Sequence, residues 1–372
     1  MNHEIPHEFE SDKNSNTQHP RWTQKLIGHN NAKKLFMESY KSGKTHHAWL
    51  INGPKGIGKA TLSWQITKFL LNDYSSIDFN DKIKKSVISR RIEALSEPSL
   101  FLCRKQFDKS KNRFFQEISV DEIRKINHFF SLTNSESKWR IVIIDAVDDL
   151  SNSAANALLK ILEEPPMGGI FFLICENKEK ILPTILSRCR LLKCSFLEWD
   201  EFKEILSGLK IIKIEEKDMM KLFSLTKGSI SKAIDIAVND GFEILKQIFE
   251  ILNFKNQIDR SKIWNLLNQN SSPSTSKERY LFIKELLLFS LSTISTSSAK
   301  PNVEFYSTEE KEIVEYYYTT GSYFPFAWIH SLLINDFKQA DAINLDPIDT
   351  LLIAFFKIEK ILLRFRELTQ KN

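Results

Sequence analysis

The pattern of hydrophobic positions predicts an α/β region in the first half of the chain. Short apolar runs typical of buried strands lie at 48–53, 139–144 and 169–175. Stretches with apolar residues at helical spacing alternate with them, at 31–42, 61–71, 117–132 and 151–166, and a short helix leads into a further strand within 182–194. Because strands and helices of this length alternate, we expect right-handed crossovers around a parallel sheet.

Beyond residue 198 the apolar pattern is helical throughout. Three short helical patterns fill 198–241, and longer ones fill 242–372 with apolar stripes wide enough to pack on one another. Residues 1–20 are hydrophilic and lack a periodic apolar face, so we predict a disordered lead-in. The expected domains are therefore an α/β domain at 21–197, a three-helix lid at 198–241 and an all-α domain at 242–372.

The charged, weakly periodic segment 75–115 is typical of a variable insertion. It ends in a basic run, Arg104, Lys105, Lys109, Lys111 and Arg113. A solvated loop is the ordinary interpretation of such a run, and a contact with DNA or a partner protein is the alternative. The sequence leaves open whether 104–113 touches DNA.

Composition and charge narrow the class of protein. The 372 residues include only 11 Gly and 11 Pro, which excludes a collagen-like or wholly disordered chain. Lys and Arg exceed Asp and Glu by 52 − 47 = 5, an excess that permits contact with nucleic acid without establishing it. The four cysteines form no C-x-x-C pair, and neither a secretory signal nor a membrane span is apparent. We expect a reduced cytoplasmic protein that does not enter a membrane.

A glycine-rich loop between the first strand and its helix has the features of a phosphate-binding loop. Successive backbone N–H groups at a helix N-terminus converge on a phosphate, glycines allow close approach, and a lysine neutralises charge. The loop residues that meet this need are Gly53, Gly56, Gly58 and Lys59. A glycine turn that binds no nucleotide is the alternative, although the order of strand, loop and helix favours a phosphate site.

Two residues that a hydrolytic nucleotide site requires are absent. The position after the lysine normally supplies a hydroxyl to magnesium, but it is Ala60, and Thr61 lies on a different face of the helix. Asp145 ends the second strand, where a carboxylate orients magnesium through water, but its neighbour Ala146 cannot activate a water. Asp148 and Asp149 are interpreted as solvated acids at a helix entry. We therefore predict a nucleotide fold without its hydrolytic residues.

The segment Ser153–Pro166, followed by Ser187-Arg188-Cys189, resembles the bacterial clamp-loader branch of the AAA+ ATPases. The likeness covers about 20–240 closely and the rest by helical pattern alone. The resemblance implies a RecA-like AAA+ domain with a P-loop, a small three-helix lid and a C-terminal all-α collar. It also implies related subunits in a hetero-oligomeric ring as partners, with the sliding clamp and primer-template DNA reached through that complex.

The resemblance assigns roles to individual residues. Arg188 occupies the position of an arginine finger that would reach the γ-phosphate held by an adjacent subunit, and a salt-bridging surface arginine is the alternative. Gly28 would lie near the adenine. Lys232 stands where relatives carry a second sensor arginine, and Cys175 replaces a sensor hydroxyl. These departures weaken the local site further.

Many such subunits carry a four-cysteine zinc module between the two nucleotide motifs, but here only Cys103 lies in that segment. One thiolate cannot complete a tetrahedral site, so we expect no zinc. No cofactor is expected to be required, and binding of ATP or ADP is expected to be weak.

We interpret the chain as a clamp-loader subunit of the replicative DNA polymerase, with no ATPase activity of its own. An active AAA+ motor that uses Lys59, Asp145 and a shifted Thr61 is the main alternative. A small-molecule P-loop kinase would need neither the motif around Arg188 nor a helical third domain.

Overall fold

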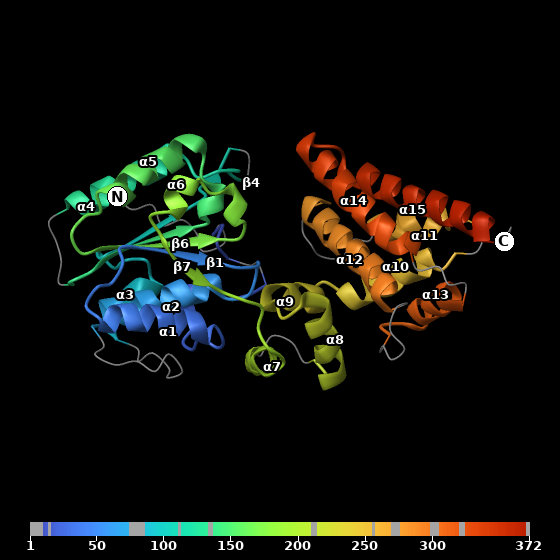
Figure 1. The fold of residues 1–372 in the computed structure, drawn as a ribbon, viewed down its shortest axis with the longest axis horizontal. Helices are drawn as coiled ribbons and strands as arrows, with labels where there is room; N and C mark the ends of the chain where they lie inside the picture. The colour runs from blue at the N-terminus through green and yellow to red at the C-terminus, as the bar shows by residue number, and fades with distance from the viewer. Residues whose placement is uncertain are drawn as a thin grey trace. The chain divides into compact units, whose positions relative to one another are not determined.

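The computed structural model describes residues 10–13, 16–73, 86–110, 113–132, 137–209, 214–254, 257–268, 276–297, 305–319 and 324–369. The chain packs as two compact units, Met1–Ile234 and Asp235–Asn372. The first unit holds the α/β domain and most of the lid, and the second is helical (Figure 1). The expected fold class, an α/β P-loop domain with a three-helix lid and a C-terminal all-α region, is confirmed.

The first unit is built on a parallel five-stranded sheet with the strand order β2-β5-β6-β1-β7. The strands are β1 (Ala48–Asn52), β2 (Leu100–Arg104), β5 (Arg140–Asp145), β6 (Gly169–Cys175) and β7 (Arg190–Lys193). Asp145 pairs in register with Arg104 on one side and Ile174 on the other, and Asn52 pairs with Cys175. The residues that follow β1, β5 and β6 therefore meet at the carboxyl edge, where ligands bind in sheets of this kind.

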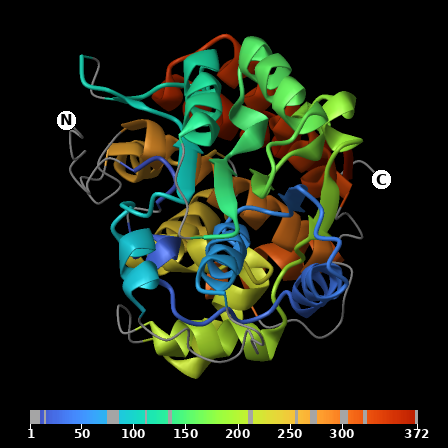
Figure 2. The same ribbon diagram turned by 90° about the vertical axis from the view of Figure 1, so that its left-hand side faces the viewer.

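Helices cover both faces of this sheet (Figures 1 and 2). One face packs on α1 (Asn30–Lys41), α2 (Lys59–Leu71) and α3 (Val87–Glu93), and the other on α4 (Val120–Ser131), α5 (Asn152–Glu163) and α6 (Pro183–Leu186). In β1, Trp49 and Ile51 enter the first core and Ala48 and Leu50 the second, because successive side chains of a strand point to opposite faces. Burial on both faces explains why the strands are continuous apolar runs.

The lid and the second unit follow the predicted helical patterns. The lid consists of α7 (Trp199–Gly208), α8 (Glu216–Thr226) and α9 (Ile230–Val238). The second unit contains α10 (Gly241–Leu252), α11 (Arg260–Asn268), α12 (Ser276–Ser297), α13 (Thr308–Thr319), α14 (Phe324–Ala342) and α15 (Pro347–Thr369). Within the described residues, no helix is long and apolar enough to cross a membrane.

The prediction of an insertion at 75–115 is wrong in its central part. This segment contains α3 and β2, an edge strand of the main sheet, followed by a hairpin of β3 (Phe107–Asp108) and β4 (Arg113–Phe114). The strand was missed because its apolar residues, 100–103, lie within an otherwise charged segment, and at the edge of the sheet the first three residues of the strand are only partly buried. Residues 74–85 and 111–112, including Lys111, lie outside the described part of the chain.

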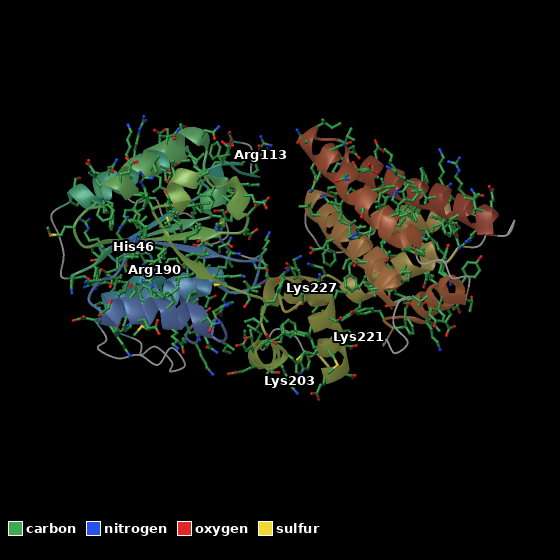
Figure 3. All side chains as sticks on the ribbon, viewed as in Figure 1. His46, Arg113, Arg190, Lys203, Lys221 and Lys227 are labelled. Atoms are coloured by element: carbon green, nitrogen blue, oxygen red, sulfur yellow. The ribbon has the colours of Figure 1, made fainter. Side chains whose placement is uncertain are left out.

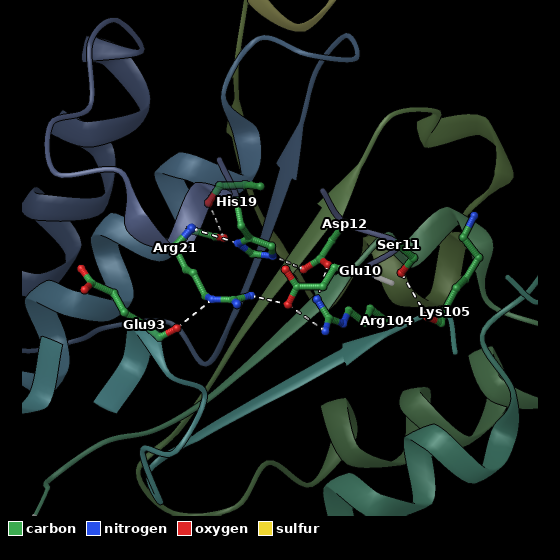
Figure 4. Close-up of polar contacts among 10 residues, drawn as sticks. Glu10, Ser11, Asp12, His19, Arg21, Glu93, Arg104 and Lys105 are labelled. Atoms are coloured by element: carbon green, nitrogen blue, oxygen red, sulfur yellow. Dashed lines mark hydrogen bonds and ion pairs between the residues drawn. The ribbon is translucent and has the colours of Figure 1, made fainter. Parts of the chain in front are cut away.

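The prediction that residues 1–20 are disordered is also wrong for 10–13 and 16–19. The first of these segments packs against the carboxyl end of β2 through a buried network of charged side chains (Figure 4). Its bonds are Glu10 with Arg21 (2.6 Å) and Arg104 (3.2 Å), Asp12 with His19 (2.8 Å) and Arg104, and Ser11 Oγ with the Lys105 carbonyl (3.0 Å). Hydrophilic residues are thus ordered by distant partners of opposite charge.

The second unit contains a buried acid, Glu310, near the start of α13. Its Oε2 accepts the N–H of Tyr306 at 2.6 Å, and its own N–H is bound to Ser307 Oγ at 3.1 Å. Burial raises the pKa of Glu310 to about 7, although hydrogen bonds that the carboxyl accepts from the backbone of Tyr306 and Ser307 oppose the rise. The folded protein therefore holds a proton at pH 5–7 that the unfolded chain releases.

This shift predicts a pH-dependent gain of stability for Glu310→Gln. The raised pKa of Glu310 lowers the free energy of unfolding of the native protein, and this cost grows as the pH rises from about 4.5 to about 7. Above about pH 7 the cost is constant, because the folded carboxyl is then also ionised. The variant should gain up to about 3 kcal/mol at pH 8 and little at pH 4.5. Urea unfolding of both proteins at these two pH values measures the difference, and an equal effect at both would refute the assignment.

Candidate functional site

The predicted phosphate-binding loop joins β1 to α2 at the carboxyl edge of the sheet. A Cβ at Gly53 would lie 2.3 Å from the Cys194 carbonyl oxygen, so only glycine allows this approach. Gly56 and Gly58 have φ values of 75° and 103°, in the left-handed region that side chains avoid. The three glycines thus give the loop its shape, and the loop opens at the N-terminus of α2 as the sequence predicts.

Lys59 lies inside the loop and binds its backbone. Its Nζ donates to the carbonyls of Gly53 at 2.8 Å and Pro54 at 2.6 Å, and it lies 4.0 Å from Glu176 Oε1. Burial lowers the pKa of Lys59, and the nearby carboxylates, Glu176 first, oppose this shift. The amine that would meet a phosphate therefore lies within the loop, but binding a phosphate would require it to leave these two carbonyls.

Three further groups bind the remaining carbonyls of the loop, and sequence reasoning missed all of them. The pairs are His29 Nε2 with Ile57 (2.7 Å), Ser229 Oγ with Lys55 (2.9 Å) and the Ser231 N–H with Gly56 (3.2 Å). Burial lowers the pKa of His29, which favours the neutral ring that donates through Nε2. The lid segment that begins α9 is thereby fastened to the loop. A serine after Gly228 at a helix start was the signal that could have indicated this contact.

The other residues assigned from the resemblance lie around the same edge. Lys232 is on α9 directly after Ser231, the residue whose backbone binds the loop. Gly28 has a φ of 80°, and a Cβ at this position would lie 2.6 Å from Leu197 Cδ2, so the segment around Gly28 packs closely against the residues that precede α7. Cys175 ends β6, and burial raises the pKa of its thiol to about 11. The roles that the resemblance assigns to these three residues stay predictions.

The metal side of the site has the departures that the sequence indicates. Asp145 ends β5, and burial together with the charge of Asp12 raises its pKa to about 8, while Lys59 opposes the rise. Ala60 occupies the first turn of α2, and Thr61 is turned about 100° from it around the helix axis. Ala146 follows Asp145. Magnesium would lack the hydroxyl ligand that the position after Lys59 normally supplies, and no acid follows Asp145 in the sequence.

Asp148 and Asp149 are partly exposed, as expected of acids in contact with solvent, but they also have partners that we did not predict. Asp148 accepts the backbone N–H groups of Glu176 at 3.3 Å and Asn177 at 2.9 Å, which ties the end of β5 to the end of β6. Asp149 forms an ion pair with Lys105 at 2.7 Å. Both partners are distant in sequence, so a local pattern could not reveal them.

The predicted basic run is divided by the fold. Arg104 is buried against Glu10 and Asp12, and Lys105 is paired with Asp149, so these two cations are neutralised internally. Lys109 and Arg113 are exposed on the hairpin of β3 and β4, with Arg113 labelled in Figure 3. Among the described residues of the run, Lys109 and Arg113 are the ones exposed to an external phosphate, and contact with DNA stays a prediction.

Arg188 lies at the surface directly after α6. Its Nη2 is 2.8 Å from Glu163 Oε1, and its Nη1 donates to the Thr184 carbonyl at 2.9 Å and to Ser187 Oγ at 3.3 Å. Cys189 packs against the core beneath it, and burial raises the pKa of this thiol to about 12. The motif therefore has an anchored cysteine and an arginine whose side chain is 35% exposed.

Purified protein is expected to contain no stoichiometric zinc. Cys103 lies inside the sheet on β2, and the described residues contain no group of three or more His, Cys, Asp or Glu side chains that could hold a metal ion. Elemental analysis measures this directly. One tightly held zinc ion per chain would contradict the prediction.

Comparison with known proteins gives one family and several relatives. Residues 28–198 match the family model for "DNA polymerase III, delta subunit". The DNA polymerase III subunit gamma of Buchnera aphidicola subsp. Acyrthosiphon pisum is 29% identical over 304 residues, which span 76% of this chain and 80% of that protein. The subunit delta' of Bacillus subtilis is 27% identical over 225 residues, 59% of this chain and 64% of that protein. The subunit delta' of Buchnera aphidicola subsp. Schizaphis graminum is 33% identical over 193 residues, 49% and 56% of the two chains.

Proposed function

We propose, from the premise that this chain is a clamp-loader-type DNA polymerase III subunit of the AAA+ family, that it has the role of delta-prime. It is an accessory subunit of the holoenzyme and helps load the sliding clamp onto primed DNA during replication. Its own ATP site is degenerate, and Arg188 acts in trans on the ATP of a neighbouring subunit. Its partners are the gamma or tau and delta subunits, and the clamp and primer-template DNA meet it through the complex.

One observation supports the degenerate site above all. At the edge where β1 and β5 end, the loop keeps Lys59 and its glycines while Ala60 and Ala146 leave no hydroxyl and no second acid. Phosphate-binding loops hold the nucleotide through backbone and lysine, but transfer of the γ-phosphoryl group needs the metal and an oriented water. A chain that binds weakly and does not hydrolyse follows from this combination.

A gamma-like ATPase is the second candidate function. It is favoured by the gamma subunit that matches along 80% of its own length and by the retention of Lys59 and Asp145. In that case Thr61 would have to take the place of the missing hydroxyl, which requires the first turn of α2 to rotate. The two candidates differ in whether the isolated chain turns over ATP.

The isolated protein is therefore expected to show negligible ATP hydrolysis. Steady-state phosphate release with magnesium and ATP measures it, with Lys59→Ala as the control for contaminating activity. A rate of about 1 per second that Lys59→Ala abolishes would establish the gamma-like candidate, because such a value is ordinary for enzymes. Identification of the subunits that copurify with the tagged chain tests the partners separately.

A further inference from the structure

Glu163 is placed to control the geometry of Arg188. It is the last residue of α5, and its side chain is 44% exposed at the same surface as Arg188. The carboxylate binds Nη2, while the carbonyl of Thr184 in α6 binds Nη1. Two anchors on two different helices fix both the position and the plane of the guanidinium.

We propose that Glu163 is a positioning residue that holds Arg188 ready for the γ-phosphate of the neighbouring subunit. This inference rests on the trans-acting role proposed for Arg188. A guanidinium has five N–H donors. The contacts recorded among the described residues use three of them, two on Nη1 and one on Nη2. The Nε–H and one Nη2–H remain, so the side chain can bind a phosphate oxygen without leaving Glu163.

We expect Glu163 to restrict the motion of the Arg188 side chain rather than to stabilise the fold. A free arginine side chain loses about 2 kcal/mol of rotamer entropy when it is fixed, and a partner that fixes it beforehand removes part of that cost from catalysis. An exposed ion pair by itself adds little to folding. Moreover, a carboxylate at the C-terminus of a helix is disfavoured by the helix dipole, so α5 would be at least as stable without it.

The neighbouring acid Glu164 supplies a matched control. It follows Glu163 directly, is exposed, and forms no recorded ion pair within the described residues. Replacing either residue by alanine removes one negative charge from nearly the same place. Any effect of net charge on assembly or on DNA is therefore common to both variants, whereas an effect on Arg188 belongs to Glu163 alone.

The experiment compares Glu163→Ala, Glu164→Ala, Arg188→Ala and the double variant Glu163→Ala with Arg188→Ala in the complex reconstituted with its partner subunits. ATPase is measured with clamp and primed DNA, and the Arg188-dependent turnover is the rate that Arg188→Ala removes. Glu163→Ala should lower that turnover about two- to fivefold, the range for an exposed ion pair, through kcat and not KM. Glu164→Ala should match the native protein, and melting temperatures should not fall.

The possible outcomes distinguish a failure of the positioning role of Glu163 from a failure of the trans-acting role proposed for Arg188. In the Arg188→Ala background, Glu163→Ala should have no further effect, because the pair then has no arginine to position. If Arg188→Ala lowers turnover while Glu163→Ala behaves like Glu164→Ala, Arg188 acts in trans but Glu163 does not position it. An equal loss in both backgrounds would show that Glu163 acts elsewhere. If Arg188→Ala itself changes nothing, the trans-acting role and this inference both fail.

Discussion

Arg188→Ala should leave this subunit folded and able to join its ring, but it should lower ATP turnover by the assembled complex. An arginine finger supplied in trans is worth roughly 10³ to 10⁵ in rate at one site. In the ring proposed above, the loss for the whole complex should be smaller because the other sites would keep their own fingers. Reconstitution with partner subunits, followed by ATPase assays stimulated by clamp and DNA, measures the change.

Arg188→Lys is the informative comparison for this expectation. A lysine keeps the positive charge but lacks the planar fork that holds two oxygens at once, so it should restore little of the turnover. Gel filtration of each reconstituted complex controls for assembly. If assembly is normal and the native, Ala and Lys forms turn over ATP equally, Arg188 is only a surface residue paired with Glu163.

Arg104→Met should reduce the free energy of unfolding by about 3–5 kcal/mol, the cost of leaving a buried charge without its partner. Arg104 is 11% exposed, and its partners Glu10 and Asp12 are 5% and 1% exposed. Burial by itself would raise the pKa of both acids. The pKa of Glu10 is nevertheless held below its usual value by a hydrogen bond and the charge of Arg21, and that of Asp12 by His19 in the same way. The charge of Arg104 lowers both pKa values. Without Arg104, Glu10 would keep only Arg21 and Asp12 only His19, and the two buried carboxylates would lose the cation that they share.

Lys105→Met is the matched control, because Lys105 is the next residue and its ion pair with Asp149 is partly exposed. It should cost at most about 1 kcal/mol. The loss in Arg104→Met should shrink as the pH falls below about 4, since carboxylates whose folded pKa is depressed give stability that is lost when they are protonated below their unfolded pKa values. Urea unfolding at pH 7.5 and at about pH 3 measures both effects. Equal losses for the two variants would show that the network at 10–12 does not stabilise the fold.

The sequence predicted the parallel sheet and the position of the glycine-rich loop well for a physical reason. Strands buried on both faces must be apolar along their whole length, and a loop that approaches a carbonyl within 2.3 Å of a Cβ position must have glycine, as at Gly53. Both requirements concern residues that are close together in the sequence, so a short stretch of sequence reveals them. The missing hydroxyl at Ala60 and the missing acid at Ala146 were visible for the same reason, because these sites are defined by their spacing from Lys59 and Asp145.

The sequence by itself therefore determined the class of fold, the position of the nucleotide-type loop and the residues that this loop lacks. Tertiary structure alone decided the electrostatic partners: Glu10 and Asp12 for Arg104, Asp148 for the end of β6, His29 and Ser229 for the loop carbonyls, and Glu163 for Arg188. Hydrophobic periodicity is a local property that the chain carries in each element. Pairing of charges depends on which distant segments the fold brings within about 3 Å of one another, and a short stretch of sequence does not reveal which segments these are.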